Sequence, residues 1–381
     1  MIRSIRSLVI AFGLVGSLTA PGHAADAIKI GAILAVTGPA SNLGAPEART
    51  LEMLVHDINA KGGINGKTVE LLVKDTGGSP EKAISFAKQL IEEEKVFAII
   101  GPSTSGETMA IKNIAEEGKT ILLSCAAAEV IVNPLARYVF KVAPKDSFAV
   151  TRIFEQMKKM NISTIGVLSS NTGFGKAGKE QLEKLAPAQG IRILISEVYD
   201  KNATDLTAEV TKIRAQGVQA VVNWSIEPAQ SIVIKNIRQA GMTVPVFQSH
   251  GFANIQYVKA AGKAADGVIF PASRIVVADV LPSKHPQKQV VMAYKKAYEE
   301  KYREDVSTFG GHTYDAMTIL ARAIREGGTD REKVRSSIEN MKNVIGTAGV
   351  FNFSPTDHNG LDIDAFAMLT VKNGKFALLE K

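Results

Sequence analysis

Residues 28–75 read IKIGAILAVTGPASNLGAPEARTLEMLVHDINAKGGINGKTVELLVKD, and this stretch decides the fold. Two short runs of aliphatic and β-branched residues, 28–34 and 69–75, flank a segment whose apolar residues recur at helical spacing from about 45 to 60. A strand, a helix and a strand at this spacing are typical of parallel strands joined by a crossover helix. They predict a parallel sheet with helices on both faces.

The same alternation continues to the C-terminus. Further strands are predicted at 98–101, 121–124, 164–169, 193–198, 218–223, 244–247 and 267–270. Helices are predicted at 80–94, 106–117, 147–159, 176–186, 287–301, 313–325 and 331–341. A hairpin over 366–379 ends the chain. Because the pattern restarts after residue 142, we predict an α/β protein with two doubly wound parallel-sheet units in series.

Composition sets the number of domains and excludes some partners. The chain has 381 residues, of which 45% are hydrophobic and 22% charged. This composition is globular, and the chain is too long for one compact core. We therefore expect two domains, joined by several ordered crossings because no flexible linker interrupts the pattern. The net charge of +7 comes from 45 basic and 38 acidic residues spread along the chain. Without a basic block, we expect no nucleic-acid partner.

The N-terminus predicts export. Two arginines precede an apolar run over 8–18, and small residues offer a cleavage site after Ala24. This pattern is typical of a secretory signal peptide over residues 1–24. A membrane anchor is the alternative, but the apolar run is about half the length of a spanning helix. Cys125 is the only cysteine, so no intrachain disulfide forms. An exported protein without disulfides suits the bacterial periplasm.

Ligands of open parallel sheets bind beyond the carboxyl ends of the strands, where loops and helix N-termini converge. Five loops follow such ends, namely GPSTSGETMA from 101, SCAAAEV from 124, SSNTGFGKAG from 169, WSIEPAQ from 224 and FQSHGFANI from 247. The first loop places Ser103, Thr104 and Ser105 at a predicted helix start. With the free N–H groups of that helix, the hydroxyls of Thr104 and Ser105 would form an anion site suited to a small carboxylate. An ordinary helix cap is the alternative.

Aromatic and polar side chains in the other loops suggest the wall of a ligand site. Phe174, Trp224 and Phe252 lie in three of these loops. Aromatic loop tips that face a cleft form an apolar surface for a ligand, and the alternative is that they pack beneath their own loops. Glu227 and His250 are the polar candidates, and Glu227 is able to receive an ammonium group. The other interpretation of Glu227 is an exposed glutamate at a helix start.

The loop after residue 168 also contains two nucleotide patterns. Gly173, Gly175 and Gly178 satisfy GxGxxG, and residues 173–179 satisfy GxxxxGK. The phosphate-loop pattern fails at Glu180, where magnesium binding needs a hydroxyl, so a glycine-rich turn that opens a helix is favoured. No metal-ligand spacing and no nucleophile elbow occur in the sequence. We expect no catalysis, cofactor or metal, and a periplasmic nucleotide-using enzyme is the alternative from another class.

Several stretches together resemble one family. Residues 28–75, with AIIGPSTSG (98–106) and ILLSCAAA (121–128), are similar to the periplasmic solute-binding proteins of branched-chain amino acid ABC importers. The similarity extends through YVFKVAP, GVLSSNTGFGKAG and GGHTYDAMTIL. It implies two α/β lobes of the type I fold, joined by a three-crossing hinge, that close on a ligand. The implied lobes are 25–144 plus 273–352 and 145–272 plus 353–381.

The resemblance also implies a function. Such a receptor binds a small hydrophobic carboxylate, here a branched-chain or related amino acid, and delivers it to a permease in the inner membrane. We expect a monomer, and a sensory module that hands its solute to a receptor is a further alternative. In the family, the loops matching GPSTSG and SCAAA hold the ligand carboxylate, and an aromatic residue covers its side chain. The implied residues are Thr104, Ser105, Ala126, Ala127, Phe174 and Trp224.

Three positions depart from the family pattern. Ala128 or Glu129 stands where the family has a threonine hydroxyl, and Leu43 replaces a common aromatic. His250 stands where the family has the acidic residue that binds the α-ammonium group. A neutral histidine cannot replace that carboxylate. Either Glu227 supplies the countercharge, or the ligand lacks an ammonium group and is an aromatic or other hydrophobic carboxylate.

Overall fold

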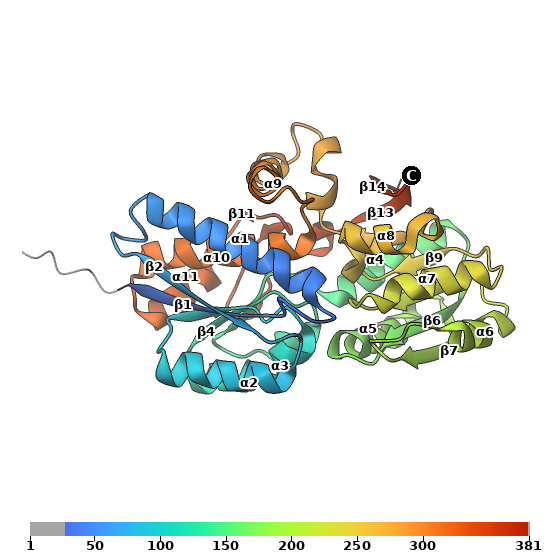
Figure 1. Cartoon of the computed structure of the whole chain (residues 1–381), viewed down its shortest axis with the longest axis horizontal. Helices are drawn as coiled ribbons and strands as arrows, with labels where there is room; N and C mark the ends of the chain where they lie inside the picture. The colour runs from blue at the N-terminus through green and yellow to red at the C-terminus, as the bar shows by residue number, and fades with distance from the viewer. Residues whose placement is uncertain (1–26, 380–381) are drawn as a thin grey trace, which may run out of the picture.

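The computed structural model describes residues 27–379, so the predicted signal peptide over 1–24 lies outside the described residues. Two large sheets lie side by side, and helices cover both faces of each (Figure 1). We call each sheet with its helices a lobe. The predicted α/β class is confirmed. Within residues 27–379, no helix is both long enough and apolar enough to cross a membrane.

The first sheet is entirely parallel, in the order β2-β1-β3-β4-β5. Most aliphatic side chains of its strands are buried, as a sheet between two helical layers requires. Its strands are β1 (Ile28–Leu34), β2 (Val69–Asp75), β3 (Ala98–Ile100), β4 (Ile121–Ser124) and β5 (Val139–Lys141). The helices between them are α1 (Ser41–Ala60), α2 (Pro80–Lys88), the π-helical turn η1 (Gln89–Glu93), α3 (Ser105–Glu117) and the 3₁₀ turn η2 (Glu129–Ile131).

The second sheet is mixed, in the order β14-β13-β10-β9-β8-β6-β7, because the C-terminal hairpin pairs antiparallel with β10. Its strands are β6 (Thr164–Ser170), β7 (Arg192–Tyr199), β8 (Ala220–Trp224), β9 (Val246–Gln248), β10 (Ile269–Ala272), β13 (Ala367–Lys372) and β14 (Lys375–Leu378). Its helices are α4 (Asp146–Lys159), α5 (Gly173–Leu185), η3 (Pro187–Gln189), α6 (Thr207–Ala215), α7 (Ala229–Gln239), η4 (His250–Phe252), α8 (Ile255–Ala261) and η5 (Gly262–Ala265).

The chain then returns to the first lobe. The long helix α10 packs along α1 and against α11 (Figure 1). The elements of this segment are η6 (Arg274–Val280), α9 (Lys288–Tyr302), α10 (Thr308–Gly327), α11 (Arg331–Asn340), β11 (Val344–Ile345) and β12 (Val350–Phe351). The turn η7 (Ile363–Ala365) leads back to the second lobe.

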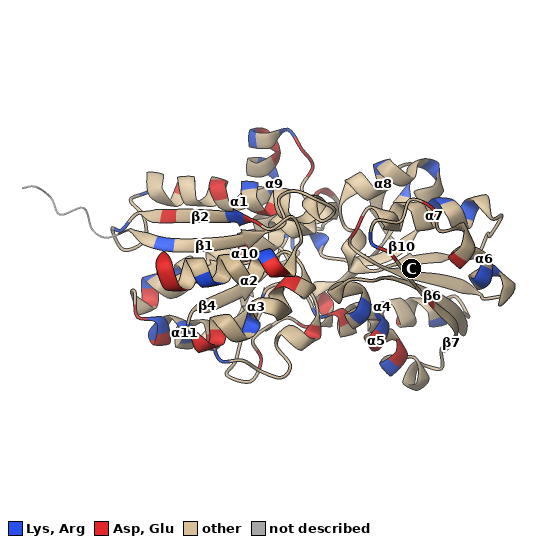
Figure 2. Ribbon diagram, turned by 60° about the horizontal axis from the view of Figure 1, so that its bottom comes forward, with Lys and Arg blue, Asp and Glu red and all other residues tan. Residues whose placement is uncertain are grey.

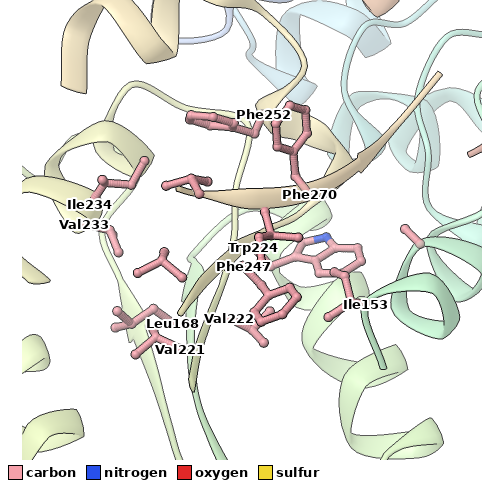
Figure 3. Close-up of a cluster of buried hydrophobic side chains, with 14 of the residues drawn as sticks. Ile153, Leu168, Val221, Val222, Trp224, Val233, Ile234, Phe247, Phe252 and Phe270 are labelled. Atoms are coloured by element: carbon pink, nitrogen blue, oxygen red, sulfur yellow. The ribbon is translucent and has the colours of Figure 1, made fainter. Parts of the chain in front are cut away.

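Each lobe has its own hydrophobic core, and the chain passes between the cores three times. The second core surrounds Trp224 and Phe270 (Figure 3). Phe353 and Leu361 pack in the first core, whereas Phe366 packs in the second. The domain bounds given above stay a prediction, and this packing argues for a last boundary near residue 365 instead of 353.

Three helices begin three to five residues earlier than predicted, namely α1, α5 and α10, and α10 begins at Thr308 and not at 313. Helix α1 begins at Ser41 and carries Pro46 inside it, although the sequence pattern placed the start near 45. Helix α5 begins at Gly173 and not at 176, so the glycine-rich segment is helical. Proline and glycine usually mark helix boundaries, and here tertiary contacts override that preference.

Charged residues of both signs are interspersed over the outer helices of both lobes (Figure 2). In that view, Lys and Arg positions alternate with Asp and Glu positions along the ribbon.

Candidate functional site

A pocket lies between the two lobes. Its walls are mostly apolar, and they come from both lobes and from the crossings between them. The lining residues are Leu43, Ser103, Ser105, Cys125, Ala126, Ala127, Pro144, Phe174, Ile226, His250, Gly251, Ser273, Thr308, Phe309, His312 and Phe366. We call this space the inner pocket. It brings together seven of the residues that the sequence assigned to the site: Leu43, Ser103, Ser105, Ala126, Ala127, Phe174 and His250.

The lobes touch each other around this pocket. The side-chain amide of Asn254 in the second lobe donates to the Asn42 carbonyl at 2.8 Å. That carbonyl is available because Pro46, four residues later in α1, has no N–H to donate to it. The N-termini of α3 and α5 also meet, with Gly106 and Gly173 in backbone contact. These contacts join the two lobes beside the inner pocket.

One wall of the inner pocket offers hydrogen-bond donors to an anion. The Ser105 Oγ accepts from the Ala128 N–H at 3.3 Å, which leaves the hydroxyl hydrogen of Ser105 available. The Ala127 N–H makes no hydrogen bond within residues 27–379. Ser105 is the first residue of α3, where the helix dipole favours negative charge, and Ala127 directly precedes the Ala128 that donates to Ser105. A carboxylate placed here would accept from both.

Ser103 and Ala126 line the same wall, but their polar groups already have partners. The Ser103 hydroxyl donates to the Glu47 carboxyl and accepts from the Ala35 N–H at 3.0 Å. The Ala126 N–H donates to Ser124 Oγ at 3.1 Å. These two residues shape the wall, and the donors for a ligand come from their neighbours.

Thr104 and Glu227 lie together elsewhere, in an outer cavity near the mouth of the cleft. Thr104 is the N-cap of α3, where its Oγ1 accepts from the Glu107 N–H at 3.3 Å and donates to the Glu107 carboxylate at 2.5 Å. The Glu227 carboxylate accepts from the Ser225 hydroxyl at 2.7 Å and from the Ile226 N–H at 3.2 Å. Each side chain therefore makes its hydrogen bonds to residues of its own segment, and neither lines the inner pocket.

The aromatic wall is built in two layers. Phe174 lines the pocket, and Trp224 lies behind it with ring centroids 5.7 Å apart. Trp224 is fully buried, so it supports the wall without forming it. Phe252 packs against Phe270 at 5.3 Å, beneath its own loop (Figure 3). Phe366, which the sequence reasoning missed, completes the wall beside His250 at 5.2 Å. Ala128, like Trp224, is buried one layer behind the pocket.

Two histidines line the pocket from opposite lobes. His250 follows β9 in the second lobe, and His312 lies on α10 in the first. Burial, with a smaller effect from nearby Lys141, lowers the pKa of each to about 3. Both rings are therefore neutral at physiological pH. His312 was missed because it comes from a helix and not from a loop after a strand.

Charged groups near the pocket are buried behind its lining. Burial raises the pKa of Glu47 to about 8, although its bond from Ser103 works in the opposite direction. Burial lowers the pKa of Lys141 to about 7, and neighbouring Asp146 opposes this. No Asp or Glu side chain is among the described residues that line the inner pocket. The pocket therefore offers no carboxylate to an ammonium group.

The three glycines of the nucleotide patterns are explained by packing. A Cβ at Gly175 would lie 1.9 Å from the Ser170 carbonyl oxygen, and a Cβ at Gly178 would lie 2.0 Å from the indole nitrogen of Trp224. A Cβ at Gly173 would lie 2.7 Å from the Cα of Gly106 in the other lobe. The segment is a close-packed helix start, and no phosphate-binding loop forms there.

Metal and nucleophile chemistry find no support in the described chain. Residues 27–379 contain no group of three or more His, Cys, Asp or Glu side chains placed to hold a metal ion. The Cys125 thiol is buried, and burial raises its pKa well above the ordinary value. A neutral buried thiol is a packing group and not a nucleophile.

Substituting Glu47 should change how stability depends on pH. Because burial raises its pKa to about 8, the folded state keeps a proton that the unfolded state releases above the ordinary pKa of 4.5. The stability contributed by Glu47 therefore falls as pH rises from about 4.5 to 8. Glu47→Gln removes this term, so its melting temperature relative to wild type should increase between pH 5 and pH 8. Calorimetry on both proteins measures this, with the exposed Glu52→Gln on the same helix as control. Parallel pH curves for wild type and Glu47→Gln would refute it.

Comparisons with known proteins agree with this geometry. A family model described as periplasmic binding protein matches residues 27–375. A leucine-, isoleucine-, valine-, threonine-, and alanine-binding protein of Pseudomonas aeruginosa is 26% identical over 345 residues, which is 89% of this chain and 87% of that protein. An extracellular ligand-binding receptor of Rhodopseudomonas palustris has a TM-score of 0.88 at 28% identity, and the match covers 93% of this chain and 100% of that one.

A further solved structure is the branched-chain amino acid transporter substrate-binding protein of Streptococcus pneumoniae in complex with isoleucine. Its TM-score is 0.81 at 26% identity, with 92% of this chain and 98% of that one covered. The predicted type I fold and the resemblance to branched-chain amino acid receptors are confirmed. The relatives are solute-binding receptors and not enzymes. The chain belongs to the periplasmic binding protein family.

Proposed function

We propose that this protein is the receptor of an ABC importer, which captures a small hydrophobic carboxylate between its lobes and delivers it to the permease in the inner membrane. The observation that carries the proposal is the inner pocket, whose apolar walls come from both lobes and whose free donors, Ser105 and the Ala127 N–H, lie at one end. A ligand that touches both lobes binds the closed form better than the open form, and this difference drives closure. The receptor acts as a monomer.

The chemistry of the pocket favours a ligand without an ammonium group. A buried ammonium needs a carboxylate or several acceptors, because burying an unpaired charge is costly. The lining contains no Asp or Glu, and the Glu227 carboxylate is bonded within its own loop. An aromatic or branched aliphatic acid meets the donors at Ser105 and Ala127 and leaves no charge unpaired.

A branched-chain amino acid is the second candidate, and the names of the relatives favour it. The Pseudomonas aeruginosa relative is named for binding five amino acids, and the Streptococcus pneumoniae structure holds isoleucine. For this ligand, the Glu227 side chain would have to leave its bonds to Ser225 and Ile226 and turn toward the inner pocket.

A thermal-shift screen of the mature protein separates the two candidates. We expect 4-methylpentanoate or 3-phenylpropanoate to raise the melting temperature, and leucine and phenylalanine, which add only the ammonium group, to raise it less. A ligand at a hundred times its Kd adds roughly 2.7 kcal/mol of stability, which is several degrees for a chain of this size. A shift with amino acids alone would establish the second candidate. No shift with either series would contradict capture of a hydrophobic carboxylate.

Glu227→Gln tests the source of a countercharge directly. If the ligand lacks an ammonium group, we expect this variant to bind it with the affinity of wild type, because Glu227 lies outside the inner pocket. Titration calorimetry with the best acid from the screen measures the affinity. A loss of roughly tenfold or more, as expected when a buried charge loses its partner, would place Glu227 in the ligand site.

A further inference from the structure

The two pocket histidines are buried without hydrogen-bond partners. His250 is 7% exposed and His312 is 4% exposed. Neither ring nitrogen of His250 has a partner within the described chain, and the His312 ring has only a weak contact with the Cys125 backbone. Buried polar side chains are almost always bonded, and leaving one unpaired costs about 1–3 kcal/mol. At least three such nitrogens in one pocket therefore point to a bonding partner that comes with the ligand.

Aromatic rings hold these imidazoles in place. Phe174 and Trp224 meet the His250 ring edge-to-face at 5.3 and 5.7 Å, and Phe366 packs on it at 5.2 Å. On the first lobe, Phe309 meets His312 edge-to-face at 6.2 Å. The rings are thus fixed by packing and not by hydrogen bonds, which leaves their nitrogens free for a ligand.

The charges near the two histidines restrict which ligand group these side chains can bind. Neutral imidazole has one donor and one acceptor nitrogen. The positive charge nearest to them is Lys141, which is buried behind the pocket and opposes any further cation. An ammonium group would find acceptors here but no negative charge. An uncharged hydroxyl or carbonyl satisfies the imidazoles without burying a charge.

We infer that His250 and His312 form a second polar subsite, supplied by opposite lobes, which binds an uncharged hydroxyl or carbonyl group of the ligand. This inference rests on the proposed function and narrows its ligand class to hydrophobic acids that carry a hydroxyl or oxo group in addition to the carboxylate. Because His250 and His312 belong to different lobes, a group that bonds both makes its full set of contacts only in the closed form. The subsite therefore couples ligand identity to lobe closure.

Matched pairs of acids test the subsite in the wild-type protein. The pairs are 4-hydroxybenzoate with benzoate, 4-hydroxyphenylacetate with phenylacetate, and 4-methyl-2-oxopentanoate with 4-methylpentanoate. We expect the oxygenated member of at least one pair to bind at least tenfold more tightly by titration calorimetry. If acids bind but no pair differs by more than about twofold, the subsite is wrong and the proposed function stands. If no acid binds, the proposed ligand class fails and the subsite fails with it.

Variants of the two histidines test whether their ring nitrogens cause the difference in affinity between the two acids of a pair. His250→Phe and His312→Phe keep an aromatic ring and remove the nitrogens, so each should bring the affinities of the two members of the preferred pair to within about threefold of each other. His312→Gln retains a donor and an acceptor and should keep part of the preference. The exposed His56→Phe is the control and should keep all of it. A preference that survives both phenylalanine variants would overturn the assignment.

Discussion

We expect Gly173→Ala to weaken the binding of every ligand by roughly ten- to a hundredfold while the unliganded protein stays as stable as wild type. A Cβ at Gly173 would lie 2.7 Å from the Cα and 2.8 Å from the nitrogen of Gly106 across the cleft. Both neighbours are backbone atoms of a helix start, so the clash is relieved by opening the lobes. Forcing an extra methyl group into a closed contact costs about 1–3 kcal/mol, and here that cost falls on the closed form alone.

Gly106→Ala is the matched control for this variant. Its Cβ would have no neighbour nearer than 3.8 Å, which is an ordinary contact. Alanine also favours both helices over glycine, so helix propensity cannot account for a loss in Gly173→Ala alone. Titration calorimetry gives the affinities, and small-angle scattering reports whether ligand still reduces the radius of gyration. Wild-type affinity in Gly173→Ala would show that ligand binding does not need this contact between α3 and α5.

The sequence predicted the sheets well because their strands are regular. The strands at 28–34 and 121–124 are mostly buried aliphatic runs, and 69–75 is a half-buried edge strand; the structure has the predicted bounds for all three. No strand was predicted over 139–141, because three residues are too few to show a periodicity and Lys141 at its end is atypical of a buried strand. Local pattern therefore identified the long strands, whereas the short strand β5 is identified by its pairing with β4, and the helices α6 and α7 were not predicted.

Helix starts were predicted less well, and the cause is tertiary contact. Pro46 inside α1 leaves the Asn42 carbonyl without an intrahelical donor, and Asn254 of the other lobe supplies the missing bond. Helix α5 contains three glycines because backbone atoms of Gly106 and Ser170 and the indole of Trp224 leave no room for a Cβ at those positions. A sequence pattern cannot reveal a partner that lies about two hundred residues away.

The sequence predicted only those pocket residues that lie in loops after the carboxyl ends of strands. The rule that ligands bind beyond the carboxyl ends of strands identified Ser105, Ala127 and His250, which share the inner pocket. It could not find His312 on α10 or Phe366 at the last crossing, because neither follows a parallel strand. A signal for His312 was present, since this histidine lies between Gly311 and Thr313 in the first turns of a helix whose later residues are mostly apolar.

We expect Gly178→Ala to lower the melting temperature by several degrees and to weaken ligand binding. A Cβ at Gly178 would lie 2.0 to 2.3 Å from three atoms of the Trp224 indole, so the indole has to move. Overpacking of this kind costs about 1–3 kcal/mol. Trp224 supports both Phe174 and His250, so its displacement disturbs the aromatic wall of the inner pocket. Trp224 is the only tryptophan in the chain, and its fluorescence should shift to longer wavelength as the indole leaves its buried position.

The clash between Gly178→Ala and the indole can be isolated with a double-mutant cycle. Trp224→Phe alone leaves a cavity and destabilises the protein, but its smaller ring makes room beside residue 178. Adding Gly178→Ala to Trp224→Phe should therefore cost less than it does in wild type, and the difference in unfolding free energy is the coupling between the two positions. Urea unfolding of the four proteins measures it. If Gly178→Ala lowers the unfolding free energy equally in both backgrounds, the methyl group acts on the helix itself. The requirement for glycine at position 178 would then not come from contact with Trp224.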